Sequence, residues 1–302
     1  MSLTFPLVYL KTFETLMTSP DVAFSCRGMK IWKELMAQTS YIHIYASRAA
    51  IFSHTTHRVT PIRFVLAELC WILAGRFDVK SIVSYNKAIA HYSDDGKTIG
   101  GSYGLRLAEQ LPVLVQRLQA DMHTRQACAS IFDRTDCLNT NKTHMPCNVF
   151  LQFICRPPHL YLHVISRSSD FATGFSIDSI HWQVLLIMMA NELSNICGET
   201  IVPMDIVYTI SSLHIYTVDT PVIEQWTVYE EVVPRFSIIE PYGYDLNMRL
   251  GLSEAIQRAK DMFKEDLSVE ELGNILMLDE MSMCNVKEMH EKFLTHRNKL
   301  VR

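Results

Sequence analysis

Residues 146–198 read PCNVFLQFICRPPHLYLHVISRSSDFATGFSIDSIHWQVLLIMMANELSNICG, and this stretch decides the fold class. Apolar residues alternate with other residues over 147–155 and 160–166, which predicts two β-strands. The residues Arg156-Pro157-Pro158-His159 between them are typical of a turn. Residues 179–197 are mostly apolar at helical spacing and are followed by Gly198. We therefore expect a long buried helix that ends at this glycine.

A second helix is predicted upstream of this stretch. Thr60 and Pro61 are typical of the N-cap and the first residue of a helix, and Gly75 is typical of a helix stop. The apolar residues between them recur at helical spacing, and Glu68 lies near the middle of this otherwise apolar segment. An unpaired carboxylate would be costly on such a face, so Glu68 needs a partner or a function.

Mixed helices and strands continue to the C-terminus. Residues 205–216 are strand-like, and from Leu252 onward the sequence becomes charged and helical, with a capping box at Ser268 and Glu271. This mixed order predicts an α+β or α/β domain. We expect a catalytic domain over residues 1–245 and a helical C-terminal extension over residues 246–302.

The composition limits the function classes. The 302 residues are 48% hydrophobic and 20% charged, which excludes a disordered or fibrous chain. The net charge is −4 and basic runs are absent, so no chain-wide nucleic-acid surface is expected. The eight cysteines form no CxxC pairs or His/Cys clusters, which argues against a metal site and a disulfide framework. Neither a signal-peptide pattern nor an apolar run of about 18 residues is found. We expect a cytoplasmic protein, in the host cytoplasm if it is viral, without membrane contact.

Five short motifs follow one another between Pro61 and Tyr216. They are Glu68-Leu69-Cys70-Trp71 with Gly75, Ile99-Gly100-Gly101-Ser102-Tyr103-Gly104, Pro146-Cys147 with Leu151-Gln152-Phe153, Arg167-Ser168-Ser169-Asp170 with Gly174, and His214-Ile215-Tyr216. In this order and spacing they resemble the motifs of the thymidylate synthase family, over about half of the chain. The resemblance implies an α+β fold, with a mixed β-sheet that is flanked by helices and forms the interface of a homodimer.

The resemblance assigns the nucleophile to Cys147. Taken alone, a cysteine in an apolar strand is more often a small buried hydrophobic residue. A thiolate that adds to carbon 6 of a pyrimidine makes carbon 5 nucleophilic, and this covalent catalysis needs a thiol pKa lowered by positive charge. Arg167 is expected to supply that charge and to hold the nucleotide phosphate. The alternative for Arg167 is a solvated arginine at a strand end.

The other motif residues receive roles from the same resemblance. Glu68 is expected to act as an acid or base beside the folate, and the alternative is a structural ion pair with Arg106 or Arg63. The remaining implied roles are catalysis for Tyr103, phosphate binding for Ser168, folate binding for Asp170 and Gly174, and binding of the sugar hydroxyl for His214 and Tyr216.

Two further arginines are implied at the phosphate site. Family members borrow arginines of a Ser-Arg-Arg motif from the second subunit, and the corresponding residues here are Thr124-Arg125-Gln126, which retain Arg125 alone. Arg27 corresponds to an arginine near the N-terminus that binds phosphate. The assignment of Arg125 assumes the homodimer.

Asp178 bears on the identity of the base. The segment from Gly174 to Asp178 aligns with the family's Gly-x-Pro-Phe-Asn, whose asparagine reads uracil. Cytosine offers an amino donor and an N3 acceptor, which match a carboxyl that accepts at one oxygen and donates from the other. We therefore expect Asp178 to read cytosine, as in the family's deoxycytidylate hydroxymethylases, with a pKa raised by burial. The alternative is that Asp178 caps a helix that begins near Ser179.

Two departures from the family favour addition of water over hydride transfer. No tryptophan occurs between Tyr85 and Ser102, where Ala88, His91 and Tyr92 are the nearest candidates, and the short apolar tail that closes over the folate is not recognisable. The sequence thus predicts a dCMP 5-hydroxymethylase that uses 5,10-methylenetetrahydrofolate. The alternatives are a dCMP or CMP methyltransferase, a dUMP-using enzyme and a nucleotide- or RNA-binding homologue without catalysis.

Overall fold

Strands β5 (Asn148–Arg156) and β6 (His159–Ser166) form the antiparallel hairpin that the sequence predicts, with Pro157 and Pro158 at the turn. The computed structural model describes residues 3–26, 28–52, 60–139, 144–220, 223 and 243–300. The hairpin lies within a sheet in the order β1-β2-β8-β6-β5-β4, and β7 pairs with β8. The other strands of this sheet are β1 (Phe24–Cys26), β2 (Met29–His43), β4 (Cys128–Ser130), β7 (Ser169–Asp170) and β8 (Val202–Tyr216). Because β6 pairs with β8 in parallel and β2 with β8 antiparallel, the sheet is mixed, as expected.

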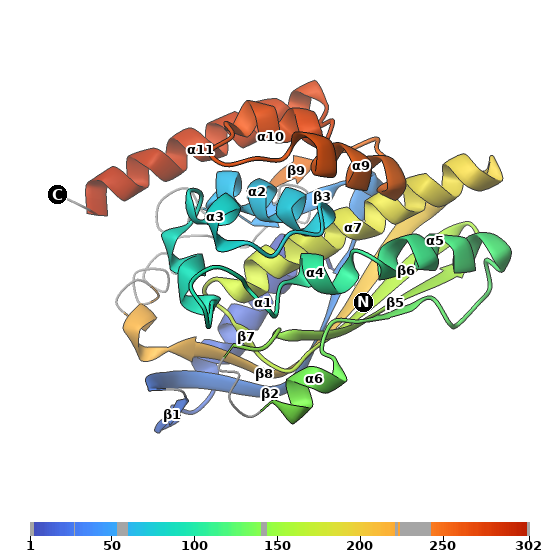
Figure 1. The fold of residues 1–302 in the computed structure, drawn as a ribbon. Coiled ribbons are helices and arrows are strands. Elements are labelled where there is room, and N and C mark those ends of the chain that lie inside the picture. The colour runs from blue at the N-terminus through green and yellow to red at the C-terminus, as the bar shows by residue number, and fades with distance from the viewer. Residues whose placement is uncertain are drawn as a thin grey trace.

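Helix α7 (Gly174–Cys197) lies across one face of this sheet (Figure 1). It ends at Gly198, whose φ of +72° is the left-handed conformation that glycine adopts readily, so the predicted stop is confirmed. The predicted start near Ser179 is wrong, because the helix begins at Gly174. The ring of Phe175 packs on Phe171 and Tyr9, and this contact holds the first turn in helical form.

The first 140 residues contribute further helices. They are α1 (Phe5–Thr18), α2 (Ile62–Leu73), α3 (Val79–Val83), α4 (Tyr103–Leu107), α5 (Gln110–Ala120) and α6 (Arg134–Leu138), with short 3-10 turns η1 (Tyr45–Ser47) and η2 (Lys87–Tyr92). A third such turn, η3 (Thr217–Asp219), follows β8. Helices α2 and α5 pack against α7. Helix α2 begins one residue later than predicted, because Pro61 takes the flanking position, and Gly75 lies beyond its end with a φ of +70°.

Three helices at the C-terminal end cover α2 and α7 (Figure 1). They are α9 (Leu252–Met262), α10 (Val269–Ile275) and α11 (Glu280–Leu300), and they confirm the predicted helical region. The predicted capping box is present, since Ser268 accepts from the backbone of Glu271 and Glu271 accepts from the backbone of Ser268. A small sheet of β3 (Ala49–Phe52) and β9 (Gly243–Leu246) lies beside them. The domain boundary at residue 245 stays a prediction.

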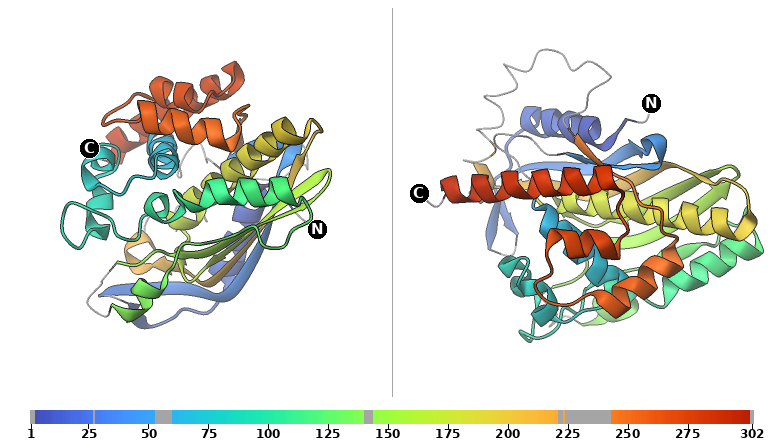
Figure 2. Two further views of the ribbon diagram at one scale, coloured as in Figure 1. Left: turned by 45° about the vertical axis from the view of Figure 1, so that its right-hand side comes forward. Right: turned by 90° about the horizontal axis from the view of Figure 1, so that it is seen from above.

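The opposite face of β5, β6 and β8 carries no helix of the described residues, as Figures 1 and 2 show. Its side chains are half-buried and largely apolar, and they include Phe150, Ile154, Tyr161, Ile165 and Val207. The inward face of the same strands is fully buried against α7 and neighbouring helices. None of the described helices is long and apolar enough to cross a membrane.

Candidate functional site

The β5–β6 hairpin places Cys147 beside Arg167. Asn148 pairs with Ser166 at the open end of the hairpin, so the residues that flank this pair are neighbours. Nη2 of Arg167 lies 3.8 Å from Sγ of Cys147. The thiol is half-buried, whereas Cys155 on the same strand is fully buried, so Cys147 is not a core cysteine.

The guanidinium of Arg167 is fixed in this position. Its Nε donates to the carbonyl oxygen of Pro146 at 3.0 Å and its Nη2 donates to that of Met145 at 3.0 Å. The backbone N–H of Arg167 donates to the carbonyl of Cys147 at 2.9 Å. Arg167 is therefore not the solvated strand-end arginine that the sequence left open. An arginine has five N–H donors, so donors remain for an anion after these bonds.

Asp178 lies in a buried hydrogen-bond network. Asn148, which is fully buried, donates from Nδ2 to Oδ2 of Asp178 at 2.8 Å and to the hydroxyl of Tyr103 at 2.8 Å. The hydroxyl of Tyr208 lies 3.1 Å from Oδ1 of Asn148 and 3.4 Å from Oδ2 of Asp178. The carboxyl of Asp178 thus points into the sheet beside the nucleophile.

The helix-cap alternative for Asp178 is wrong. Asp178 is the fifth residue of α7, because the helix begins at Gly174, and the N-cap residue is Thr173. Burial raises the pKa of Asp178 to about 7, against the opposing effect of hydrogen bonds from Asn148, Tyr208 and Tyr103. This carboxyl is therefore available in both neutral and ionised forms near neutral pH.

Glu68 lies on α2 and faces the same region. Burial and the charge of Asp178 raise the pKa of Glu68 to about 8. The proposed ion pairs with Arg63 or Arg106 are not formed, because Arg63 binds Asp266 and Arg106 binds Asp133 and Asp136.

The Nε2 atom of His181 lies 4.0 Å from the Glu68 carboxylate. Burial lowers the pKa of His181 to about 4, and Nε2 lies 3.0 Å from the carbonyl oxygen of Val65. At neutral pH this imidazole is uncharged, so it does not neutralise Glu68. Among the described residues, Glu68 thus has no cationic partner, and such a carboxyl is typical of an acid or base that exchanges protons during a reaction.

Tyr92 also faces this region from the end of η2. Its ring contacts that of His144 edge-on, with centroids 5.9 Å apart, and its side chain is 53% exposed. Partial burial and the negative charges of Cys147, Asp170, Tyr216 and Glu68 raise the pKa of Tyr92. Of the sequence candidates for the position of the missing tryptophan, Tyr92 is thus an aromatic side chain whose surroundings include the charge of Cys147.

The remaining motif residues lie where β7 joins β8. Asp170 pairs with His214 across these strands, and the rings of His214 and Tyr216 are 4.7 Å apart. Asp170 accepts from the backbone of Ala172 and from the hydroxyl of Thr173. Gly174 lies close to Ser169, since a Cβ there would be 3.2 Å from Oγ of Ser169. The carbonyl of Ser168 lies 2.8 Å from Oγ of Ser166, beside Arg167.

Of the two other predicted phosphate arginines, the structure describes Arg125, which is not part of this group. Arg125 is exposed, and its carbonyl accepts from the side chain of Gln152, five residues along β5 from Cys147. That separation corresponds to about 17 Å of extended strand, so Arg125 does not reach Cys147 of its own chain. Arg27 lies outside the described residues.

The sequence did not indicate Asn148 or Tyr208. Asn148 has a weak signal, since it is a polar residue at an inward position directly after the nucleophile. Tyr208 has none, because it looks like an ordinary strand aromatic and its contact with Asn148 joins residues 60 positions apart.

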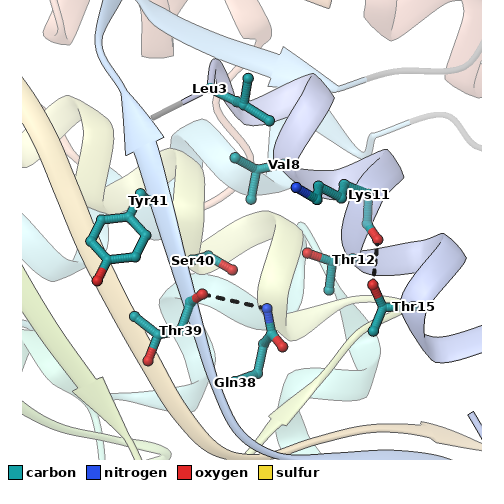
Figure 3. Close-up of a pocket in the computed structure, with 9 residues that line it drawn as sticks. All are labelled: Leu3, Val8, Lys11, Thr12, Thr15, Gln38, Thr39, Ser40 and Tyr41. Carbon is teal, nitrogen blue, oxygen red and sulfur yellow. Dashed lines mark hydrogen bonds between the residues drawn. The ribbon is translucent and has the colours of Figure 1, made fainter. Parts of the chain in front are cut away.

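The described residues also form a hollow that lies outside the candidate site. A hollow between α1 and β2 is lined by residues that include Lys11, Ser40 and Tyr41, and none of the predicted site residues takes part in it (Figure 3). In the described part of the chain, no group of three or more His, Cys, Asp or Glu side chains is placed to hold a metal ion.

Comparison with known proteins agrees with the motif order. The family model described as thymidylate synthase matches residues 22–267. A deoxyuridylate hydroxymethyltransferase of Bacillus phage SP01 is 29% identical over 242 residues, which cover 67% of this chain and 62% of the relative. A protein of the same name from Pseudomonas phage M6 is 31% identical over 130 residues, which cover 40% of this chain and 37% of the relative. The matched region thus spans less than two thirds of the length of either relative.

Proposed function

Because this chain belongs to the thymidylate synthase family, we propose that it transfers a one-carbon unit to carbon 5 of a pyrimidine nucleotide through an adduct with Cys147. The observation that carries the proposal is the pairing of an accessible thiol with a fixed guanidinium 3.8 Å away. Positive charge at this distance favours the thiolate, which is the form that adds to carbon 6 of the ring. Arg167 then has two roles, since its unused N–H donors bind the nucleotide phosphate beside Ser168.

Tyr92, Asp170 and Gly174 fit a folate, and this family uses 5,10-methylenetetrahydrofolate as its one-carbon donor. The half-exposed ring of Tyr92 offers a stacking surface, and Asp170 offers a carboxylate for hydrogen bonds to a pterin. Gly174 leaves room at the start of α7. When bound, the folate supplies a carbon at the oxidation level of formaldehyde.

We propose that water completes the reaction. Carbon 5 gains the one-carbon unit, and loss of the proton at carbon 5 releases tetrahydrofolate and leaves an exocyclic methylene on the ring. Water then adds its oxygen to this methylene, and the bond to Sγ of Cys147 breaks, which returns the thiolate. The net change is the addition of the elements of formaldehyde to the nucleotide, with tetrahydrofolate released. Glu68 is the group that handles the proton of water, because its raised pKa lets it exchange protons near neutral pH. The names of both phage relatives agree with this outcome.

For the nucleotide, we propose dCMP, with the sugar held by His214 and Tyr216. A neutral Asp178 can donate from one oxygen to N3 of cytosine and accept the amino group at the other. The pKa of about 7 makes this neutral form accessible at little cost. The second candidate is dUMP, which the names of the phage relatives favour. A neutral carboxyl reads uracil when its proton lies on the other oxygen.

We further propose that the chain acts as a homodimer. The uncovered face of β5, β6 and β8 presents Phe150, Ile165 and Val207 to solvent in the single chain. Covering such a face stabilises an obligate interface. Arg125, which lies far from Cys147 of its own chain, would reach the phosphate site of the partner. Sedimentation velocity tests the dimer, and substitution of Ile165 by Asp should give monomers.

The function is tested by product analysis. The purified protein is incubated with methylenetetrahydrofolate and either dCMP, CMP or dUMP, and the products are identified by mass spectrometry. A gain of the elements of formaldehyde on dCMP supports the full proposal. A gain of a single methylene shows that hydride transfer is retained. Conversion of dUMP alone refutes the choice of base, while the absence of any covalent adduct with a 5-fluoropyrimidine nucleotide and folate refutes the enzyme.

A further inference from the structure

Asn148 and Tyr208 both contact the same oxygen of the Asp178 carboxyl. Asn148 donates to Oδ2 at 2.8 Å, and the Tyr208 hydroxyl lies 3.4 Å from Oδ2. Tyr103 also forms a hydrogen bond with this carboxyl, which lowers the pKa of Asp178. Oδ2 is therefore the oxygen that faces the Asn148 donor before any nucleotide binds.

The orientation of the Asn148 amide is fixed by its other contacts. Its second N–H donates to the hydroxyl of Tyr103 at 2.8 Å, and its oxygen lies 3.1 Å from the hydroxyl of Tyr208. Asn148 and Tyr208 are both fully buried, so water does not replace these partners. An amide with both N–H groups and its oxygen engaged holds its donor toward Oδ2.

A donor aimed at Oδ2 decides where the proton of a neutral Asp178 resides. A proton on Oδ2 would face the N–H of Asn148, which is repulsive, whereas a proton on Oδ1 leaves Oδ2 as the acceptor. Cytosine accepts at N3 and donates from its amino group, whereas uracil donates from N3 and accepts at O4. A carboxyl with a mobile proton reads both bases, but one whose proton is confined to a single oxygen reads one.

We propose that Asn148, assisted by Tyr208, is a positioning residue for base selection, which confines the proton of Asp178 to Oδ1 and so gives the carboxyl a fixed donor and a fixed acceptor. This inference rests on the proposed function, since it assumes that Asp178 meets the base. It adds that Asp178 alone does not select the nucleotide, because the orientation of Asn148 decides which carboxyl oxygen carries the proton.

The same contact stabilises the ionised carboxyl, which provides a test in the absence of nucleotide. The titratable groups that face Asp178 are Glu68 on α2, Tyr103 on α4, Tyr208 on β8 and Cys147 before β5. Of these, Glu68 titrates in the same range as Asp178, so the assignment of each carboxyl has to be made separately.

The experiment measures the titration of Asp178 by carbon-13 NMR of the aspartate carboxyls, assigned by comparison with Asp178→Asn. Asn148→Leu keeps the shape of the side chain and removes its donor. Loss of a hydrogen bond to a charged group should move the titration upward by roughly one to two pH units. Tyr208→Phe removes one hydroxyl with little change of volume, and it should move the titration upward by roughly half a unit. Tyr45→Phe, at a side chain that is 70% exposed, is the matched control and should leave it unchanged.

The second readout is the ratio of kcat/KM for dCMP and dUMP. In Asn148→Leu this ratio should move toward one by roughly tenfold, because the proton is then free to lie on either oxygen. Tyr208→Phe should move it in the same direction by a smaller factor, and this variant serves if Asn148→Leu does not fold.

The outcomes separate the two proposals. Preference for dUMP in the wild type refutes the proposed base, yet the role of Asn148 stands if Asn148→Leu erodes that preference and raises the titration. An unchanged titration and an unchanged ratio in folded Asn148→Leu and Tyr208→Phe overturn the role of Asn148. Equal loss of turnover on both nucleotides without a shift in titration also overturns it, because that pattern reports a general structural role.

Discussion

Replacement of Asp178 by Asn should make the stability of the protein less dependent on pH. The substitution keeps the shape of the side chain and an acceptor oxygen for Asn148 and Tyr208, but it removes the ionisable group. Burial raises the pKa of Asp178 from 3.8 to about 7 in the folded chain. In the unfolded chain the carboxyl returns to its ordinary pKa.

The sign of the pH effect on the free energy of unfolding follows from this difference between the folded and unfolded pKa values. Below pH 4 the carboxyl is protonated in both states and costs nothing. As the pH rises from 4 to 7 the unfolded chain loses the proton first, so the folded state is progressively destabilised. Above pH 7 the carboxyl is ionised in both states, and the destabilisation of the folded state has reached its full value.

The shift from 3.8 to about 7 is about three units, and each unit corresponds to 1.36 kcal/mol. The wild type should therefore lose up to about 4 kcal/mol relative to Asp178→Asn between pH 4 and pH 8. Part of the carboxyl remains accessible to water, so this is an upper value. Removal of the Asp178 charge also lowers the pKa of Glu68 toward its ordinary value, which acts in the same direction.

The assay is urea unfolding of both proteins at pH 5 and pH 8, without nucleotide or folate. The expected result is a free-energy difference between the variants that grows by about 2 to 3 kcal/mol from pH 5 to pH 8. Asp205→Asn, at a half-buried aspartate that pairs with His43 on the outer strand, serves as a control for the loss of one negative charge. A difference that stays constant with pH would refute the reasoning, since Asp178 would then ionise as an ordinary surface carboxyl.

Four further predictions concern the nucleophile and its surroundings. Cys147→Ser should lose activity by roughly a thousandfold or more, and it should form no covalent adduct with a 5-fluoropyrimidine nucleotide. Arg167→Met should slow the alkylation of Cys147 by iodoacetamide at pH 7 and raise the KM for nucleotide by roughly tenfold or more; an unchanged alkylation rate would contradict the role of its charge. Glu68→Gln should remove an ionisation near pH 8 from the pH profile of kcat. Tyr92→Phe should retain hydroxymethylation, whereas Tyr92→Ala should raise the KM for folate, and steady-state kinetics would measure both effects.

Much of the fold followed from local patterns. Strict alternation and the Pro157-Pro158 turn predicted the β5–β6 hairpin, and Gly198 marked the end of α7. Each of these features depends on residues within one element or its immediate flank. The start of α7 was missed because Phe175 is held in a helical turn by rings from α1 and from the segment before the helix.

The candidate site was likewise predicted in part from the sequence and in part only from the folded chain. The motif order identified Cys147, Arg167, Asp178 and Glu68, because the chemistry of the family requires these residue types at these spacings. The sequence left open whether Glu68 pairs with Arg63 or Arg106. Only the folded chain shows that both arginines are engaged elsewhere, by Asp266 and by two aspartates near α6.

The sequence by itself thus determined the family, the expected nucleophile and the residue types that surround it. The tertiary structure decided the environment of each group, including the contact of Asn148 with Asp178 and the negative charges around Tyr92. Side-chain identity and spacing are local properties that a chain carries when unfolded. Burial, charge proximity and hydrogen-bond direction arise only when residues distant in sequence meet, and these set the protonation of Asp178 and Glu68.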